Sequence, residues 1–522
     1  MTLQTESERA VCHCLPRENK AFEDGRHCLR TIHIGQLSGK QCHDADFRPN
    51  VTCASSGTPR QITRLQPEIT PSAHSESINM APIPRIAFPI LLVAVCAAVA
   101  LGGPEVPGAP QQGPIALVGG TICPVSRAPI DGGTLVFDQG RITAVGRSVK
   151  LPPGTKRIDA RGRRVYPGLI NAYSQLGLVE IGAVRATRDY AETGKINPNV
   201  KAEVAVNPDS ELIPVTRSGG VLLSLTAPSG GLISGTSALV QLDGWTGEEM
   251  TLKAPVGMHV QWPRTSPAAD WKPSESKEED VEKARDEALA LLEQTFADAR
   301  SYQKARAAGK AEAGPHPLDI RWEAMRPVLE GKLPLVVEAD EIQQIQAAVA
   351  FSQRENVKLI VYGGYDAPHC AALLKKHHVP VIVGTVHRLP RRRGDAYDAS
   401  YSLPGRLHAA GIEFCIASQN TSNARNLPLE AAMAAAYGLS PDEALKAVTL
   451  YPARILGVDD RVGSLDVGKD ATLIITDGDP LETPTHVEAA FIQGRRVDLD
   501  NRHQRLWRKY EEKYRRLEPS GK

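Results

Sequence analysis

Two titratable side chains end long apolar runs and could carry acid–base chemistry. Glu338 lies near the end of KLPLVVEAD (332–340), and His387 closes VPVIVGTVH (379–387). Desolvation raises the pKa of a carboxylate toward that of a useful general base, and histidine exchanges protons near neutral pH. The alternatives are an ordinary hydrogen-bonded glutamate and a loop histidine. We take both residues as candidate catalytic groups at the end of a strand.

Repeated strand and helix patterns must position these side chains. Short apolar runs typical of buried parallel strands span 165–173, 220–227, 237–244, 332–340, 357–364, 379–387 and 412–419. Helical patterns cover 341–354, 367–377 and 427–437. Alternating strands and helices predict an α/β fold, either a barrel or a doubly wound sheet. No GxGxxG motif follows the first strand, which disfavours dinucleotide binding.

The segments on either side of this region have different patterns. Residues 115–166 and 451–500 are rich in short strands, and Asp138 to Gly140 indicates a hairpin turn. Residues 275–312 form a charged pattern with one apolar face, which predicts a surface helix inserted in the α/β region. Residues 501–522 predict a C-terminal helix, docked through Leu506, Trp507 and Tyr510.

The first hundred residues suggest export. After Met80, residues 80–103 contain a basic position, an apolar run and a small-residue cleavage pattern, as in a secretory signal peptide. Residues 104–114 predict a linker, and residues 1–79 an upstream segment that is disordered or wrongly assigned. We therefore expect a periplasmic or extracellular protein. An uncleaved membrane anchor at 86–103 is the alternative.

Several motifs resemble the amidohydrolase superfamily, in particular its imidazolonepropionase and dipeptidase-related branch. They are DQGRI (138–142), YPGLINA (166–172), GSLDVGKDA (463–471) and IQGR (492–495). The resemblance covers roughly residues 115–500. It implies a (β/α)₈ TIM barrel over 167–450 and a small β-sandwich formed by 115–166 with 451–500. It also implies hydrolysis of a C–N bond by one or two divalent metal ions, usually zinc.

The positions that hold the metal in this superfamily carry other residues here. The first strand normally ends in PGLIDAHxH, whereas residues 167–175 read PGLINAYSQ. The five positions that correspond to metal ligands are occupied by Tyr173, Gln175, Glu338, Tyr362 and Gln419. Gln241 and Lys253 are poorly placed to be the bridging carboxylated lysine. Neutral phenols and amides are poor zinc ligands, so we expect a metal-free pocket and no cofactor.

The sequence leaves three functions open. The first is an exported hydrolase of C–N bonds, the second a catalytically inactive binding protein, and the third a metal-independent enzyme that uses Glu338 and His387. A small molecule in the barrel mouth is the expected partner, and a homo-oligomer stays open. The net charge of +1 gives no pull toward nucleic acid. The short basic run at 391–393 predicts a solvated loop.

Overall fold

The computed structural model describes residues 105–265, 278–308, 317–419 and 421–517, which all belong to one compact unit. The expected upstream segment and the signal peptide lie outside these residues. Of the expected linker, 104–114, only the first residue lies outside, and the amide of Gly108 donates to the carboxylate of Asp243 at 3.2 Å. Within the described part of the chain, no helix is both long and apolar enough to cross a membrane. Its three cysteines, Cys123, Cys370 and Cys415, are buried and unpaired.

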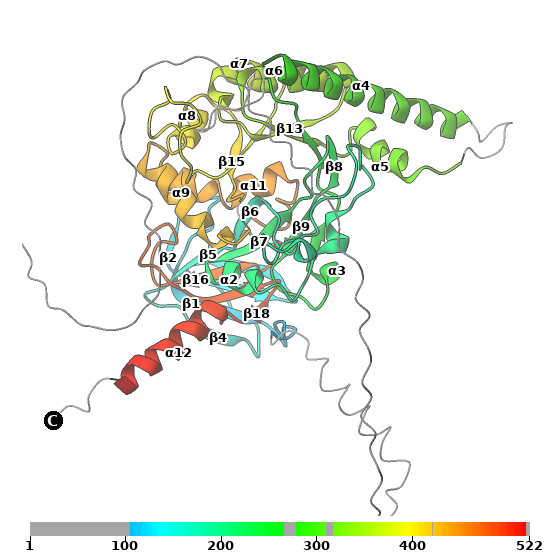
Figure 1. Cartoon of the computed structure of the whole chain (residues 1–522). Coiled ribbons are helices and arrows are strands. Elements are labelled where there is room, and N and C mark those ends of the chain that lie inside the picture. The colour runs from blue at the N-terminus through cyan, green and yellow to red at the C-terminus, as the bar shows by residue number, and fades with distance from the viewer. Residues whose placement is uncertain (1–104, 266–277, 309–316, 420, 518–522) are drawn as a thin grey trace, which may run out of the picture. The chain divides into compact units, whose positions relative to one another are not determined.

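One eight-stranded sheet, here called the flank sheet, joins the two ends of the described chain (Figure 1). Its strands are β1 (Ile115–Ile122), β2 (Ile130–Asp138), β3 (Arg141–Gly146), β4 (Lys156–Asp159), β5 (Arg164–Pro167), β16 (Leu473–Thr476), β17 (Val487–Ile492) and β18 (Arg495–Val497). β5 pairs antiparallel with β16, with Pro167 opposite Leu473. The predicted hairpin turn is present, with positive φ at Gln139 and Gly140.

Two further sheets carry the central α/β region. One contains β6 (Leu169–Ser174), β7 (Val221–Thr226), β9 (Ala238–Gln241) and β10 (Thr251–Lys253). The other contains β8 (Ile233–Thr236), β11 (Met258–Gln261), β12 (Leu335–Ala339), β13 (Leu359–Gly363), β14 (Val381–Val383) and β15 (Phe414–Ile416). The strands β11 to β15 pair in parallel. Every predicted strand is present, while β8, β10 and β11 were not predicted.

Helices follow most strands of this region. The α-helices are α2 (Leu212–Ser218), α3 (Gly247–Met250), α4 (Glu278–Ala308), α5 (Ile320–Leu329), α6 (Ile342–Glu355), α7 (Ala371–Lys376), α8 (Leu403–Ala409), α9 (Leu427–Ala436), α10 (Pro441–Lys446), α11 (Leu450–Ile455) and α12 (Arg502–Leu517). Four 3₁₀ turns are η1 (Arg185–Thr187), η2 (Ala202–Ala205), η3 (Ala367–Cys370) and η4 (Ala424–Asn426). The predicted helix at 367–377 is therefore a 3₁₀ turn followed by a short α-helix.

Of the predictions for the two charged helices, one is confirmed and the other is wrong in part. The long helix α4 confirms the predicted surface helix: it buries Leu292, Phe296 and Ala299, and Arg354 of α6 pairs with Glu293 at 2.6 Å. The predicted docking of α12 is wrong, because Leu506, Trp507 and Tyr510 are exposed. Polar interactions at the base of α12, rather than apolar packing, hold this helix against the rest of the described chain. In Figure 1, α12 projects beside β4 and β18, at the opposite end of the described unit from α4.

Candidate functional site

A cavity of about 380 Å³ opens where the parallel strands end. Its walls contain all five positions that the superfamily resemblance picked out, together with a histidine and a loop that follows β7. The lining residues are Tyr173, Gln175, Pro228, Ser229, Gly230, Ser234, His259, Val260, Gln261, Val336, Glu338, Tyr362 and Gln419. Active sites of parallel α/β folds lie at the carboxyl ends of the strands. The structure therefore brings together residues that lie up to 246 positions apart.

The register of the strands explains why these side chains meet. Gln261 of β11 lies opposite Glu338 of β12, which lies opposite Tyr362 of β13. Side chains at paired positions of neighbouring strands point to the same face of a sheet. Two residues earlier along each strand, His259 and Val336 form the next layer on that face. The cavity is thus lined by successive layers of one face of the parallel sheet.

Glu338 is the carboxylate of this cavity. It is exposed to solvent at the cavity wall, and no hydrogen bond or ion pair to it occurs among the described residues. Surrounding protein atoms desolvate the carboxylate and raise its pKa, and the nearby charge of Asp340 adds to this effect. Arg264 and Arg391 oppose the rise through their positive charges. A free carboxylate with a raised pKa can accept a proton from water.

Two tyrosines and one histidine form the floor of the cavity. The rings of Tyr173 and Tyr362 stack with centroids 3.8 Å apart, and the His259 ring lies 5.6 Å from that of Tyr173. Burial lowers the pKa of His259 to about 3, so the imidazole is neutral. Burial also raises the pKa of both phenols above the usual value, so they keep their protons. The Nε2 atom of His259 and the Oη atom of Tyr362 are buried and have no hydrogen-bond partner among the described residues.

The two glutamines take up different positions. Gln175 donates from Nε2 to the hydroxyl of Ser229 at 2.7 Å, which ties the loop after β7 to the cavity wall. Gln419, three residues beyond β15, has a φ of 24°, an unusual value for a residue with a side chain. A side chain at Gly384 would lie within 4 Å of both Gln419 and Tyr362. The absence of a side chain at that glycine keeps this part of the cavity open.

His387 does not line the cavity, so its predicted place at the end of a strand is wrong. Strand β14 ends at Val383, because the buried carboxylate of Glu430 on α9 captures the following loop. Thr385 donates to Glu430 at 2.7 Å, and the amides of Val386 and His387 donate at 2.5 and 2.8 Å. The His387 ring lies 3.6 Å from the same carboxylate, so it contributes to the contacts of this loop and not to the cavity.

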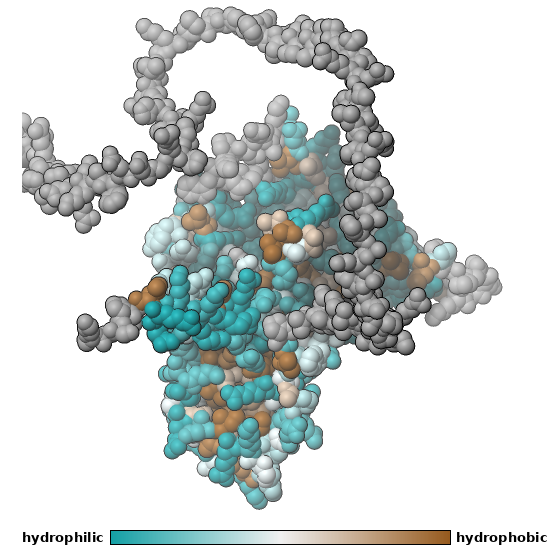
Figure 2. All heavy atoms as spheres, turned by 60° about the horizontal axis from the view of Figure 1, so that its bottom comes forward, coloured by the Kyte–Doolittle hydropathy of each residue, from teal (hydrophilic) through white to brown (hydrophobic). Residues whose placement is uncertain are grey.

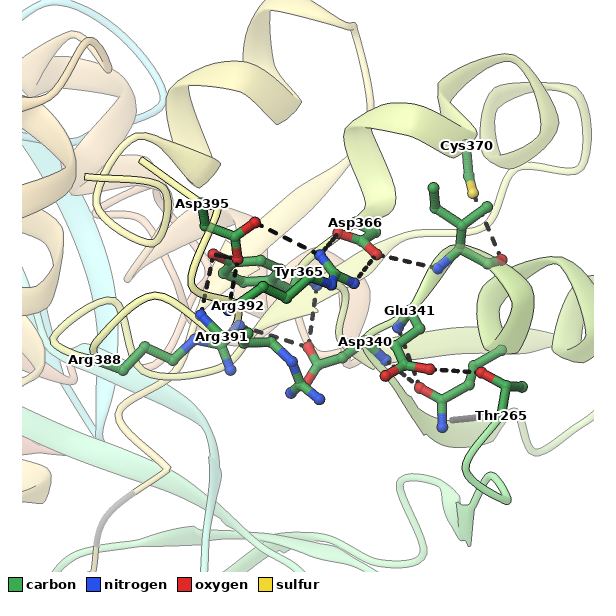
Figure 3. Close-up of polar contacts among 12 residues, drawn as sticks. Thr265, Asp340, Glu341, Tyr365, Asp366, Cys370, Arg388, Arg391, Arg392 and Asp395 are labelled. Atoms are coloured by element: carbon green, nitrogen blue, oxygen red, sulfur yellow. Dashed lines mark hydrogen bonds and ion pairs between the residues drawn. The ribbon is translucent and has the colours of Figure 1, made fainter. Parts of the chain in front are cut away.

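The basic run at 391–393 is only partly solvated. Figure 3 shows Arg391 reaching Asp340 and Arg392 reaching Asp366, at 2.6 Å in the second pair. The hydroxyl of Tyr365 also donates to Asp395 at 2.8 Å. These ion pairs tie the loop after β14 to the ends of β12 and β13, beside the cavity. The expectation of a freely solvated loop is therefore corrected for Arg391 and Arg392.

The donor set of the cavity does not fit the zinc centre that the superfamily resemblance implies. Zinc sites use several histidine, cysteine or carboxylate ligands. Within the described residues, no group of three or more His, Cys, Asp or Glu side chains lies close enough together to hold a metal ion. The amine of Lys253 donates to the carbonyls of Leu456 and Gly457 and takes no part in the cavity. Glu338 and His259 are the two common zinc-ligand types in the wall.

His259 is the residue that the sequence analysis missed. Its strand, β11, is four residues long and reads MHVQ, and buried Met258 and Val260 alternate with His259 and Gln261. A period of two is the mark of a strand, so the alternation through Trp262 was the available signal. In the loop after β7, Pro228, Ser229 and Gly230 line the cavity, whereas Gly235 lies inside buried β8.

Comparison with known proteins supports the superfamily resemblance. The Amidohydrolase family model matches residues 245–497. An imidazolonepropionase from Symbiobacterium thermophilum is 27% identical over 399 residues, which cover 70% of this chain and 88% of that protein. An amidohydrolase from Thermotoga maritima superposes with a TM-score of 0.65 and 24% identity, covering 74% of this chain and 99% of that structure.

The chain is therefore similar to the amidohydrolase family over residues 245–497 and to an imidazolonepropionase over 70% of its length. Amidohydrolase tasK from Hapsidospora irregularis is 24% identical over 405 residues, which cover 69% of this chain but 39% of that protein. The chain thus spans well under half of that relative, and most of the imidazolonepropionase. The likeness to the Thermotoga structure concerns the fold alone.

Proposed function

We propose that this protein cleaves a C–N bond of a small polar amide with Glu338 as the general base and Tyr362 as a hydrogen-bond donor. One observation carries the proposal: these two residues are register neighbours on adjacent strands and face the same cavity. Glu338 is accessible and unpaired within the described chain, while Tyr362 holds a buried hydroxyl without a partner. The homologous relatives include an imidazolonepropionase and amidohydrolase tasK.

The chemistry requires one water molecule. Glu338 takes a proton from the water while the oxygen of that water forms a bond to the amide carbon. The hydroxyl of Tyr362 donates to the carbonyl oxygen as negative charge develops there, which lowers the barrier in a partly enclosed site. Glu338 then returns the proton to the leaving nitrogen as the C–N bond breaks. The products are a carboxylic acid and an amine, and Glu338 ends in its starting state.

We propose further that this reaction needs no resident metal. Support comes from the donor types, because phenols and amides hold zinc weakly and affinity depends on several good ligands acting together. The neutral state of His259 leaves its Nε2 free to accept or donate a hydrogen bond to a ligand.

A panel assay tests the proposal. The full chain, treated with chelator, is incubated with cyclic amides and with dipeptides, and products are followed by mass spectrometry. We expect turnover that survives chelation and falls by about 100-fold or more in Glu338→Gln, since general bases contribute about 10²–10⁴-fold. Glu330→Gln, a surface variant outside the cavity, is the matched control. Turnover that requires added zinc contradicts the proposal.

Binding without turnover is the second candidate. The observation that favours it is the stacked pair Tyr173 and Tyr362, which occupies positions where the superfamily places ligands for its metal. Isothermal titration with the same amides distinguishes the two functions. A binding protein gives heat without product, both in the unchanged chain and in Glu338→Gln. A catalyst gives product in the unchanged chain but not in Glu338→Gln.

We propose that the two central sheets form one (β/α)₈ barrel and that the flank sheet forms the β-sandwich of the superfamily. Side chains support closure of the barrel, because the amide of Ser418 donates to Asn171 of β6 at 3.0 Å, across the gap between the two sheets. If the flank sheet shares its core with the barrel, residues 167–450 expressed alone form insoluble protein. A soluble, folded fragment contradicts that arrangement.

We also propose that the protein is exported through residues 80–103, with translation from Met80. The order of basic, apolar and small residues supports this. Sequencing the N-terminus of the protein purified from its native host checks it. A mature chain that begins within residues 1–79 contradicts it. A small molecule in the cavity is the proposed partner.

A further inference from the structure

The C-terminal helix α12 (Arg502–Leu517) presents an aromatic face that the rest of the described chain does not cover. None of its residues is buried, and Trp507, Tyr514 and Leu517 are 63%, 62% and 67% exposed. With about 100° of rotation per residue, these three and two neighbours, Leu506 and Tyr510, fall within an arc of about 100°. Exposing such a face to water is unfavourable, so burial of the face against an apolar partner would lower the free energy.

Basic residues border this face. The helix holds seven Lys and Arg residues against Glu511 and Glu512, so it carries a strong positive charge. The ammonium groups of Lys509 and Lys513 lie 5.9 Å from the Tyr510 ring, and Lys513 also lies 5.8 Å from that of Tyr514. The positive charges therefore lie directly beside the aromatic rings. The surface most complementary to this arrangement has an apolar interior that can accept the rings and anionic groups at its boundary with water.

The base of α12 is rigidly held, which fixes the direction of the face. Buried Asn501 accepts from the amides of His503 and Gln504, at 2.9 and 3.2 Å, and so caps the helix. Arg505 pairs with Glu211 at 3.0 Å, and Arg508 pairs with Asp500 at 2.8 Å. Figure 2 turns the end of the molecule that carries α12 toward the viewer, and hydrophilic residues cover most of this side.

A second observation concerns the chain before the described residues. Glu105 pairs with Arg217 at 3.2 Å, and Glu211 and Arg505 act electrostatically on it. The base of α12 is thus next to Glu105. The apolar sequence 86–101 ends four residues before Glu105, and four residues reach at most about 14 Å. The end of the molecule that carries α12 is therefore the end to which the apolar sequence is attached.

We propose that α12 is an interfacial helix that binds the surface of an anionic lipid membrane. Trp507, Tyr510 and Tyr514 enter the boundary between headgroups and acyl chains, and the bordering Lys and Arg residues contact anionic headgroups. Amphipathic helices with aromatic residues on one face and Lys and Arg on the other bind membranes in this way. The protein is then held at a membrane surface.

Vesicle co-sedimentation of the full chain tests the proposal. Vesicles of phosphatidylcholine alone are compared with vesicles that also contain phosphatidylglycerol, at low and high salt. We expect binding to the anionic vesicles to be at least 10-fold tighter, and to fall at least 10-fold in the variant Trp507→Ser/Tyr510→Ser/Tyr514→Ser. High salt weakens the binding of the unchanged chain because it screens the headgroup charge.

Control variants separate membrane binding by α12 from binding by the apolar sequence 86–101 and from dimer formation. Gln504→Ser changes a side chain outside the aromatic arc and leaves binding intact. All variants keep the melting temperature because the substituted side chains are exposed. The proposal is overturned if the triple variant binds anionic vesicles as tightly as the unchanged chain, since the apolar sequence then accounts for binding. It is also overturned if the triple substitution instead converts a dimer to a monomer in light scattering.

Discussion

The flank sheet and the cavity differ in how their carboxylates are paired. In the flank sheet, the buried rings of Phe137 and Phe491 meet edge to face at 5.2 Å. The buried carboxylate of Asp470 pairs with Arg461 at 2.7 Å and accepts from Gln493. In the cavity wall, the carboxylate of Glu338 has no hydrogen-bond or ion-pair partner among the described residues.

This difference separates the requirements of the fold from those of the chemistry. Packing restricts the side chains that motif positions in and around the flank sheet can accept. A side chain at Gly463, for example, would lie 2.5 Å from the Cβ of Ala453, and that glycine also has a φ of 90°. The cavity positions border an open space, although Tyr173 and Tyr362 are also part of the buried core. The scaffold and the cavity positions, such as Tyr173 and Gln175, can therefore be tested separately.

The largest expected effect is on the flank sheet. Phe491→Ala removes a fully buried ring and leaves a cavity against Phe137, so the free energy of unfolding should fall by about 3–5 kcal/mol. Urea denaturation measures this. Val467→Ala, an exposed position in the same region, should change it by less than about 0.5 kcal/mol. Equal losses in the two variants contradict a core that depends on the flank sheet.

A smaller effect is expected at the loop beside the cavity. Glu430→Ala leaves the amides of Val386 and His387 without their acceptor, which should lower the free energy of unfolding by about 2–3 kcal/mol. Limited proteolysis should cut the variant first near residues 384–400. Glu430→Gln keeps one carbonyl acceptor and should lose less. If both variants resist proteolysis like the unchanged chain, this carboxylate does not organise the loop.

Much of the fold could be predicted because its signals are local. Buried strands such as β12 and β13 are continuous apolar runs, and the turn at Gln139 and Gly140 is a hairpin signal. The docking of α12 could not be predicted, because an amphipathic pattern shows that an apolar face exists without showing what covers it. Strand β14 ended early because Glu430, 44 residues away from Val386, captures the loop.

The cavity positions could be predicted only through the resemblance to a known superfamily. Motif order placed Tyr173, Glu338 and Gln419 at the ends of three strands, and the structure brings them to one cavity. His259 was missed because its strand is four residues long. The predicted position of His387 was wrong for the same reason that the predicted end of β14 was wrong. In both cases, a hydrogen bond to a residue far away in the sequence determines the structure. Local patterns report strands well, but they do not report which loop side chains turn inward.

The buried histidine makes a pH-dependent test of the cavity wall. The folded pKa of His259 is about 3, below the value of about 6.5 expected in the unfolded chain, so the unfolded state binds the proton more readily. Its contribution to stability is complete above pH 6.5 and is lost as pH falls. The slope approaches about 1.4 kcal/mol per pH unit between pH 6 and 4. Denaturation at several pH values should show a shallower slope for His259→Gln, whereas His378→Gln, at an exposed position, should keep the original slope.

The smallest expected effect is that of metal removal. A structural zinc ion contributes about 10–16 kcal/mol of apparent binding free energy, so its removal lowers the melting temperature strongly. The cavity offers phenols, amides, one carboxylate and one histidine, and we expect a chelator to leave the melting temperature unchanged. The double variant Tyr173→His/Gln175→His sharpens the test. It adds two imidazoles to a wall that already holds His259 and Glu338, so added zinc should raise its melting temperature while leaving the unchanged chain unaffected. If a chelator lowers the melting temperature of the unchanged chain, a bound metal stabilises the protein, and the expectation of a metal-free cavity is contradicted.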